Sequence, residues 1–232
     1  MPVLEAHDLH KTYIGGDGGT INVLSGVELS VSPREMVAIV GASGAGKSTL
    51  LHVLGALDKP TRGYAVIGGE PINGLNEEQL AALRNRSVGF VFQFHHLLRE
   101  FTALENVMMP LRIAGRKLGE ARSRAEELLS RVGLSGRMHH LPSELSGGEQ
   151  QRTAVARALA MDPKVVLADE PSGNLDLANA EMLHELLQEV VNDLEIGMVV
   201  VTHNRSLAAR AGRVLLLEHG RLSETVITDA IV

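Results

Sequence analysis

The stretch that decides the fold reads Met36-Val-Ala-Ile-Val-Gly41-Ala-Ser-Gly-Ala-Gly46-Lys47-Ser48-Thr49. Its first residues, Met36–Val40, are all apolar, which predicts a β-strand covered on both faces. The residues from about Lys47 to Leu57 predict a helix. Between them lies the pattern G-x-x-x-x-G-K-[ST], whose glycines let backbone N–H groups converge on a phosphate. A Gly-rich turn with an incidental lysine is the alternative, and the flanking strand and helix argue against it.

This loop predicts a binding site for a nucleoside triphosphate and Mg²⁺, a site that several classes of P-loop protein share. Lys47 supplies a cation for the β- and γ-phosphates and is also a candidate catalytic residue. Ser48 offers a hydroxyl to Mg²⁺, Thr49 offers one to the α-phosphate, and the helix N-terminus adds a favourable partial charge. The predicted nucleotide-binding residues of the loop are Gly41, Ala42, Ser43, Gly44, Ala45, Gly46, Lys47, Ser48 and Thr49.

A second motif, Val165-Val-Leu-Ala-Asp169-Glu170, ends an apolar strand with two carboxylates. The strand brings Asp169 to its C-terminal edge, where a carboxylate can hold a Mg²⁺-bound water. Glu170 points to the other side and can act on the attacking water as a general base. An acidic pair after a strand is on its own more often a helix cap. Here it follows a phosphate-binding loop, which favours catalysis.

The alternation of strands and helices predicts an α/β fold, a P-loop NTPase core whose largely parallel sheet is flanked by helices. An antiparallel β subdomain is expected at the N-terminus, and an α-helical subdomain is expected as an insertion. We predict a single domain over residues 1–232, with the core and the β subdomain at about 1–92 and 160–232 and the helical subdomain at about 93–159.

The individual elements follow from hydrophobic periodicity and turn residues. The predicted strands are Val3–Leu9, Val23–Val31, Val88–Phe92, Val165–Asp169, Met198–Thr202 and Arg213–Glu218, with a strand and turn near Tyr64–Gly69. The other predicted helices are Glu77–Arg86, Ala103–Ala114, Leu118–Val132, Gly147–Leu159, Ala178–Leu194 and Arg205–Ala211. Ser146 is a suitable N-cap for the helix that starts at Gly147. Gly15–Gly19 is expected to form a flexible tip between the first two strands.

The composition argues against several classes of protein. Because the chain contains no Cys, a disulfide framework, a thiolate metal site and a thiol nucleophile are excluded. The net charge of −6 argues against a nucleic-acid partner. No signal peptide is visible, nor an apolar run of the ~18 residues needed to cross a bilayer. We therefore expect no direct membrane insertion.

The segment Leu145-Ser146-Gly147-Gly148-Glu149-Gln150-Gln151-Arg152 resembles the signature of the ABC transporter ATPases. A serine and a glycine pair would also suit an ordinary helix start, but the resemblance covers nearly the whole chain, from about Leu4 to Leu222. It implies that two chains form a homodimer around two ATP molecules. In that dimer the γ-phosphate held by one subunit faces four residues of the other, Ser146, Gly147, Gly148 and Glu149.

The same resemblance implies roles for residues outside these motifs. Gln93 is similar to the glutamine that reaches Mg²⁺ and the attacking water, and His203 is similar to the catalytic histidine that contacts the γ-phosphate. A lone histidine after a strand is otherwise more often structural. Tyr13 lies where the family places an aromatic ring that stacks on adenine, a surface tyrosine being the alternative. Three residues match the dimer seam: Asn174, Leu175 and Asp176.

The chain departs from the family pattern in small ways. Glu149 replaces the commoner glutamine, Ser172 replaces threonine, and Asn204 stands where an aspartate often follows the histidine. None of these removes a chemical group that hydrolysis needs, although Asn204 cannot supply a carboxylate. The presence of Glu170 implies turnover rather than binding alone.

A narrower resemblance, to the ATPases of bacterial lipoprotein-releasing (Lol) transporters, is carried by Leu50–Asp58, Phe90–Leu98, Phe101–Pro110 and Pro142–Gly148. It implies a peripheral protein on the cytoplasmic face of the inner membrane, bound to integral membrane permease subunits, two related permeases in all. The residues expected to contact the permease are His95, His96, Leu97, Leu98 and Phe101. Internal packing of the two leucines and the phenylalanine is the alternative.

Other functions share parts of this pattern. The ATPase domain of macrolide exporters and the cell-division ABC ATPase carry similar motifs. A nucleotide-gated scaffold, in which dimerisation recruits a partner and hydrolysis is incidental, is an alternative function of a different kind. The presence of both Glu170 and His203 argues against this alternative. DNA-repair ABC ATPases usually carry long coiled-coil insertions between the two nucleotide-binding motifs, and this chain has an ordinary helical stretch there.

Overall fold

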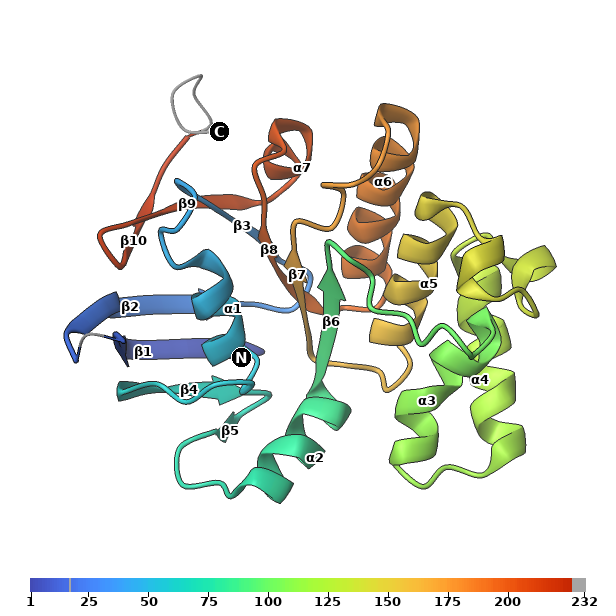
Figure 1. Cartoon of the computed structure of the whole chain (residues 1–232), viewed down its shortest axis with the longest axis horizontal. Coiled ribbons are helices and arrows are strands. Elements are labelled where there is room, and N and C mark those ends of the chain that lie inside the picture. The colour runs from blue at the N-terminus through green and yellow to red at the C-terminus, as the bar shows by residue number, and fades with distance from the viewer. Residues whose placement is uncertain (17, 227–232) are drawn as a thin grey trace.

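A six-stranded sheet forms the centre of the protein in this computed structural model, which describes residues 1–16 and 18–226 (Figure 1). Its strand order is β10-β9-β3-β8-β7-β6. The neighbouring pairs from β9 to β6 are parallel, and β10 runs antiparallel to β9 at one edge. The strands of this sheet are β3 (Met36–Val40), β6 (Val88–Phe92), β7 (Val165–Asp169), β8 (Gly197–Val201), β9 (Arg213–Glu218) and β10 (Arg221–Glu224). The predicted largely parallel sheet is confirmed.

Helices cover both faces of this sheet (Figure 1). Alternate side chains of β3 enter different cores: Met36, Ala38 and Val40 pack in one, and Val37 and Ile39 pack in the other. This burial on both faces explains why every residue of the strand is apolar. The helices are α1 (Lys47–Leu54), α2 (Glu77–Ser87), α3 (Ala103–Ile113), α4 (Leu118–Arg131), α5 (Gly147–Ala158), α6 (Leu177–Asp193) and α7 (Arg205–Ala209), with short 3₁₀ turns η1 (Ser135–Arg137) and η2 (Pro142–Glu144).

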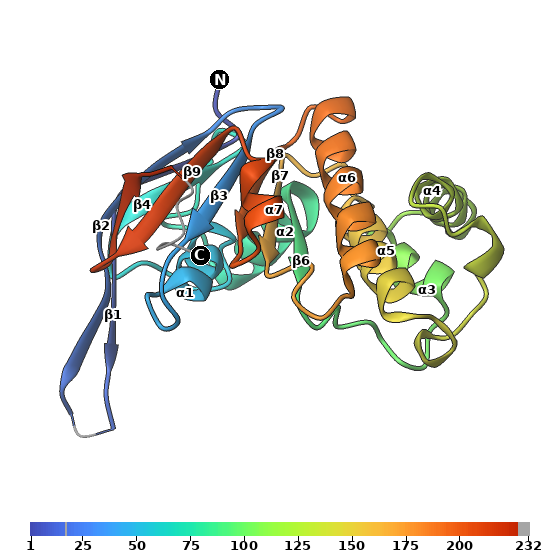
Figure 2. The ribbon, with the colours of Figure 1, turned by 90° about the horizontal axis from the view of Figure 1, so that it is seen from above.

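A second, antiparallel sheet lies beside α1 and has the strand order β2-β1-β4-β5. Its strands are β1 (Leu4–Ile14), β2 (Thr20–Val31), β4 (Arg62–Ile67) and β5 (Glu70–Pro71). The far ends of β1 and β2 form a hairpin that projects away from the rest of the protein (Figure 2). The antiparallel β subdomain predicted at the N-terminus is present.

The structure corrects several predicted boundaries. β1 runs on to Ile14 and β2 begins at Thr20, because cross-strand pairing continues past the predicted ends. The helix predicted to reach Leu57 ends at Leu54, since Gly55 follows as its C-cap and Ala56 has a left-handed φ of 55°. The helix predicted to end at Ala211 ends at Ala209, and β10 was not predicted. Within the predicted tip Gly15–Gly19, residue 17 lies outside the described residues.

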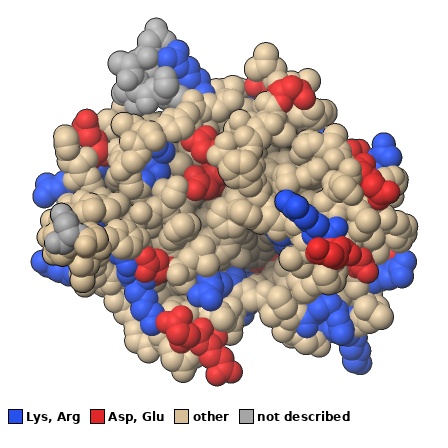
Figure 3. Space-filling model, in the orientation of Figure 1, with Lys and Arg blue, Asp and Glu red and all other residues tan. Residues whose placement is uncertain are grey.

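Helices α3, α4 and α5 lie together at the end of the molecule opposite the antiparallel sheet (Figure 2). None of the helices in the described part of the chain has the length and apolar character that a membrane-spanning segment needs. On the face shown in Figure 3, acidic and basic side chains are interspersed and do not form an extended surface of one sign.

Candidate active site

Four parallel strands deliver the predicted site residues to one edge of the sheet. β3 runs into the loop that starts at Gly41, and β6, β7 and β8 are followed by Gln93, Glu170 and Thr202. The register pairs Phe92 with Asp169 and Asp169 with Val201, so the residues that follow these strands are neighbours. Parallel pairing therefore brings together side chains that are far apart in sequence.

A cavity of about 480 Å³ lies at this edge. Its volume is in the range of small-molecule sites. Of the predicted residues, Gly41, Ala42 and Ala45 belong to the loop but do not line the cavity. The residues that do line it are Val23, Ser43, Gly44, Gly46, Lys47, Ser48, Thr49, Phe92, Gln93, Phe94, His96, Asp169, Glu170, Val201 and His203.

The loop backbone has a shape that only glycine can adopt. Gly41 and Gly46 have φ angles of 148° and 101°. A Cβ at Gly41 would lie 2.5 Å from the carbonyl oxygen of Leu217, and a Cβ at Gly46 would lie 2.6 Å from Cγ1 of Val23. α1 begins directly after the loop, and the first N–H groups of a helix have no intrahelical acceptor. They are available to an anion, as a phosphate-binding loop requires.

The Lys47 side chain is 8% exposed and bends over the loop. Its ammonium group donates to the carbonyl oxygens of Gly41 at 2.8 Å and Ala42 at 3.0 Å. An ammonium carries three N–H donors, so one remains for a phosphate oxygen. Burial lowers the pKa of Lys47, while the nearby carboxylates of Glu170 and Asp169 act to raise it.

Glu170 is held in an unusual position directly after β7. Its φ of 45° is left-handed, a conformation that costs energy for a residue with a side chain. Its Oε2 accepts from the Thr202 hydroxyl at 3.3 Å and from the backbone N–H of His203 at 3.1 Å. Its Oε1 is buried and accepts no hydrogen bond from the described residues. A buried carboxylate oxygen without a donor suits a general base beside a reacting water.

Two predicted segments contact each other across the edge of the sheet. The side-chain amide of Gln93 donates to Oδ1 of Asn174 at 3.1 Å, and the amide of Asn174 donates to the backbone carbonyl of Gln93 at 3.2 Å. A Cβ at Gly173 would lie 2.9 Å from Nε2 of Gln93. Asn174, predicted at the dimer seam, thus bonds the predicted metal-binding glutamine within one chain. The sequence contained no signal for this contact.

The other two residues predicted at the seam have local contacts. Asp176 is the N-cap of α6, and its carboxylate accepts from the backbone N–H of Asn179 at 3.0 Å. Leu175 is partly buried. Ser172, which precedes this segment, bonds the fully buried His184 of α6 through Oγ and Nε2 at 2.9 Å. The sequence pattern did not predict this partner. An imidazole among apolar residues of a helix gives no signal of its own.

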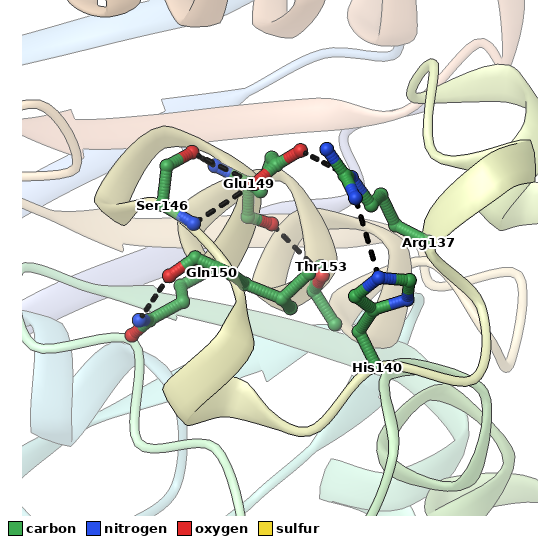
Figure 4. Close-up of polar contacts among 7 residues, drawn as sticks. Arg137, His140, Ser146, Glu149, Gln150 and Thr153 are labelled. Atoms are coloured by element: carbon green, nitrogen blue, oxygen red, sulfur yellow. Dashed lines mark hydrogen bonds and ion pairs between the residues drawn. The ribbon is translucent and has the colours of Figure 1, made fainter.

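The signature residues Ser146, Gly147, Gly148 and Glu149 do not line the cavity. Ser146 is the N-cap of α5, as predicted, and Glu149 completes a capping box with it. The Glu149 carboxylate also accepts from Arg137 at 3.0 Å (Figure 4). A Cβ at Gly148 would lie 2.3 Å from Oδ1 of Asn179, so the start of α5 packs closely on α6.

Tyr13 lies on the β1–β2 hairpin and does not line the cavity. Its side chain is 38% exposed, and its hydroxyl donates to Oδ2 of Asp58 at 2.9 Å. Burial raises the pKa of Tyr13, and the bond to Asp58 acts in the same direction. Lys11 Nζ lies 4.9 Å from the centre of the ring. Stacking of this ring on adenine stays a prediction.

The residues predicted to contact a permease separate into two groups. Leu97 is 9% exposed, which agrees with internal packing, the alternative considered for this residue. Leu98 and Phe101 are exposed at 42% and 37%. His96 lines the cavity, and burial lowers the pKa of His95. Phe94, which was not predicted, is 65% exposed.

The loop after β6 is fixed by two side chains. Asn106 is fully buried and its amide donates to the carbonyl oxygens of Leu98, Phe101 and Thr102 at 2.9 to 3.1 Å. Arg157 of α5 donates to the carbonyl oxygens of His95 and His96, both at 2.7 Å. The loop that carries Gln93 is thereby tied to α5.

A groove of about 380 Å³ lies next to this loop. Phe92 lines both the groove and the nucleotide-binding cavity. The residues that line the groove are Leu57, Ala81, Arg84, Asn85, Val88, Gly89, Phe90, Phe92, Pro110, Ile113, Arg157, Ala158 and Met161. Most of these side chains are apolar or have long apolar stems.

A glycine-rich loop between a buried strand and a helix, opposed by carboxylates at the ends of neighbouring parallel strands, defines the class of P-loop nucleoside triphosphatases. Comparison with known proteins narrows this class. A family model described as ABC transporter matches residues 24–173.

Two curated relatives are called lipoprotein-releasing system ATP-binding protein LolD. The one from Geobacter metallireducens is 55% identical over 221 residues, 95% of this chain and 97% of the relative. The one from Bordetella pertussis is 55% identical over 221 residues, 95% of each chain. Among solved structures, the dimeric ATP-binding cassette MJ0796 in a post-hydrolysis state with ADP and Pi matches with a TM-score of 0.87 and 38% identity, covering 97% of this chain and 99% of that one. The chain therefore belongs to the ABC transporter family, as an ATP-binding subunit that hydrolyses ATP.

Proposed function

We propose that this chain hydrolyses ATP to drive the release of lipoproteins from the bacterial inner membrane. The observation that carries this proposal is its similarity, over nearly the whole chain, to relatives named for that activity. The chain would lie on the cytoplasmic face of the membrane and act through integral permease subunits, two related permeases in all. Its own role is the supply of energy, so the cargo need not contact it.

ATP would bind in the cavity with its phosphates on the loop that ends at Thr49. Mg²⁺ would be held by Ser48, Gln93 and Asp169, which all line the cavity and offer the oxygen ligands that this ion prefers. When bound, Mg²⁺ neutralises charge on the phosphate oxygens. Tyr13 would stack on the adenine.

Glu170 carries the chemical step. Its carboxylate accepts a proton from water as the water oxygen bonds to the γ-phosphorus and the bond from that phosphorus to the bridging oxygen of ADP breaks. Lys47 and His203 stabilise the negative charge that spreads over the transferred group. The products are ADP and inorganic phosphate.

The complete site requires a homodimer. Ser146, Gly147 and Gly148 form a helix N-terminus suited to an anion, but they do not line the cavity of their own chain. A second copy can present these residues to the γ-phosphate, and the structurally similar cassette MJ0796 is dimeric. Asn174 and its neighbours would lie at the seam.

The permease would dock in the groove beside Phe92 and on the exposed side chains of Phe94, Leu98 and Phe101. Phe92 lines both the groove and the nucleotide cavity and directly precedes Gln93. Displacement of this ring by a docked partner would therefore move the glutamine. This contact gives the two sites a physical connection.

Purification of the chain from its native host, with mass spectrometry of the membrane proteins that accompany it, tests the proposal. Two related permeases with large periplasmic domains are expected. Recovery of a single self-pairing permease would instead support a macrolide exporter or the cell-division complex. The assignment of the chain as an ATPase would be unaffected by that outcome.

A further inference from the structure

The signature helix carries a carboxylate at the position where it should attract a phosphate. Glu149 lies in the first turn of α5, and its Oε2 accepts from both the backbone N–H of Ser146 at 2.8 Å and the Ser146 hydroxyl at 2.9 Å (Figure 4). The hydroxyl oxygen in turn accepts from the backbone N–H of Glu149 at 3.3 Å. The carboxylate therefore accepts the hydrogen bond from the Ser146 hydroxyl that a phosphate oxygen would otherwise accept.

This carboxylate stays charged. Hydrogen bonds from Ser146, first the backbone N–H and then the hydroxyl, lower the pKa of Glu149, and Arg137 acts in the same direction. A negative charge in the first turn stabilises an isolated helix. A second anion beside it is repelled, so the same charge opposes the binding of a γ-phosphate at the start of α5.

Arg137 supplies the opposite charge. It lies at the end of η1, and its Nε donates to Oε1 of Glu149 at 3.0 Å, on the side away from Ser146 (Figure 4). Its Nη1 lies 3.2 Å from Nε2 of His140. The side chains of Arg137 and Glu149 are 49% and 18% exposed, so this ion pair contributes little to the stability of the fold.

We propose that Arg137 is a positioning residue for the ATP-bound dimer. Its guanidinium neutralises Glu149 and holds Oε1, so that the start of α5 can accept the γ-phosphate bound by the other subunit. The inference rests on the proposed dimer. The inference adds that dimerisation needs the cation at position 137 when position 149 is glutamate. Dimerisation does not need that cation when position 149 carries a neutral residue.

The test compares Arg137→Gln, Glu149→Gln and the double variant, each made in a Glu170→Gln background, in which ATP should stay bound because hydrolysis is slowed. ATP-dependent dimerisation of the full chain is measured by analytical ultracentrifugation over a range of ATP concentrations. Arg131→Gln is the matched control, because Arg131 forms an exposed ion pair with Asp193 at 2.5 Å in the same group of helices.

We expect Arg137→Gln to raise the ATP concentration for half-maximal dimerisation about fivefold or more, since each dimer contains two signature segments. In the Glu149→Gln background the same change should alter that concentration less than about twofold, because the charge to be neutralised has gone. Arg131→Gln should behave as the parent does. Binding of a fluorescent ATP analogue to the monomer checks separately that the loop at Lys47 is intact.

An equal effect of Arg137→Gln in both backgrounds would overturn the inference, because it would mean that Arg137 acts independently of Glu149. The absence of any effect, with normal dimerisation of the parent, would overturn it as well and leave the proposed function standing. Failure of the Glu170→Gln parent itself to dimerise with saturating ATP would remove the dimer and this inference with it.

Discussion

The Nε2 atom of His203 lies 3.4 Å from Oε1 of Glu170, and the backbone N–H of His203 donates to Oε2 of the same carboxylate at 3.1 Å. The two residues follow the adjacent parallel strands β8 and β7, so the hydrogen bonds of the sheet fix their separation. Oε1 accepts no hydrogen bond from the described residues and is buried. It is therefore the oxygen best placed to take a proton from water.

Replacement of Glu170 by glutamine should lower the rate of ATP hydrolysis about 100-fold or more, because an amide cannot accept the proton. ATP binding should persist, since the phosphate loop is unaltered. Steady-state hydrolysis and equilibrium binding measure the two effects. Glu189→Gln, an exposed change on α6, is the control and should hydrolyse ATP at the parental rate. Undiminished hydrolysis by Glu170→Gln would rule out this residue as the base.

Lys47→Ala should abolish nucleotide binding or hydrolysis, because the variant loses the ammonium that lies over the phosphate loop. Lys59→Ala is a suitable comparison, since Lys59 forms an exposed ion pair with Glu77 at 2.7 Å. Binding of a fluorescent ATP analogue and release of phosphate should separate the two variants. If Lys47→Ala turned over normally, the assignment of the loop would be wrong.

His184 should make the fold sensitive to acid. Burial lowers its pKa, Glu181 acts to raise it from 3.6 Å, and Arg210, which pairs with Glu181, acts to lower it. Below the ordinary value of 6.5 the unfolded chain takes up a proton that the folded chain does not, so the free energy of unfolding falls as the pH drops. One such group contributes at most about 1.4 kcal/mol per pH unit.

Urea denaturation between about pH 5 and pH 8 measures this dependence. His184→Gln keeps a polar partner for Ser172 and should flatten the slope below the ordinary histidine pKa. Part of the slope should remain, because burial also lowers the pKa of His95. An identical slope in the variant would show that His184 titrates normally.

Asn106→Ala should lower the free energy of unfolding by about 2–3 kcal/mol, because the backbone carbonyl of Phe101 and the backbone N–H of Leu98 lose their side-chain partner. The carbonyls of Leu98 and Thr102 each lose one donor but keep a backbone N–H. Asn73→Ala removes one exposed hydrogen bond to Gly63 and should cost less than about 1 kcal/mol. Urea midpoints compare the two. Equal midpoints would mean that the loop does not depend on Asn106.

An acidic residue in the groove should weaken the permease contact. Ile113 lines the groove and is 70% exposed, whereas Leu118 is 63% exposed and lies outside it. Ile113→Asp should reduce co-purification of the permease several-fold, since a charged group would be desolvated on docking. Leu118→Asp should not. Equal recovery with both variants would place the permease elsewhere.

Features that depend on neighbouring residues could be predicted from the sequence. The apolar run of β3, the glycines of the phosphate loop and the cap at Ser146 were all predicted and are present. Each is encoded within a few positions, by side-chain burial, by the φ angles that glycine alone adopts, or by a hydroxyl that can accept from the first turn of a helix. The order of parallel strands then placed the predicted carboxylates at one edge.

Contacts between distant segments could not be predicted, because they depend on how the helices and sheets pack together. Gln93 meets Asn174 across 81 positions, and His184 meets Ser172 through the packing of α6 under a loop. Leu97 is buried while Phe94 is exposed, although both are apolar residues of one loop. Neither hydrophobicity nor spacing distinguishes such cases, because the direction of a loop side chain depends on what packs against it. The backbone of that loop is fixed by Asn106 and Arg157, which bond it from two other helices.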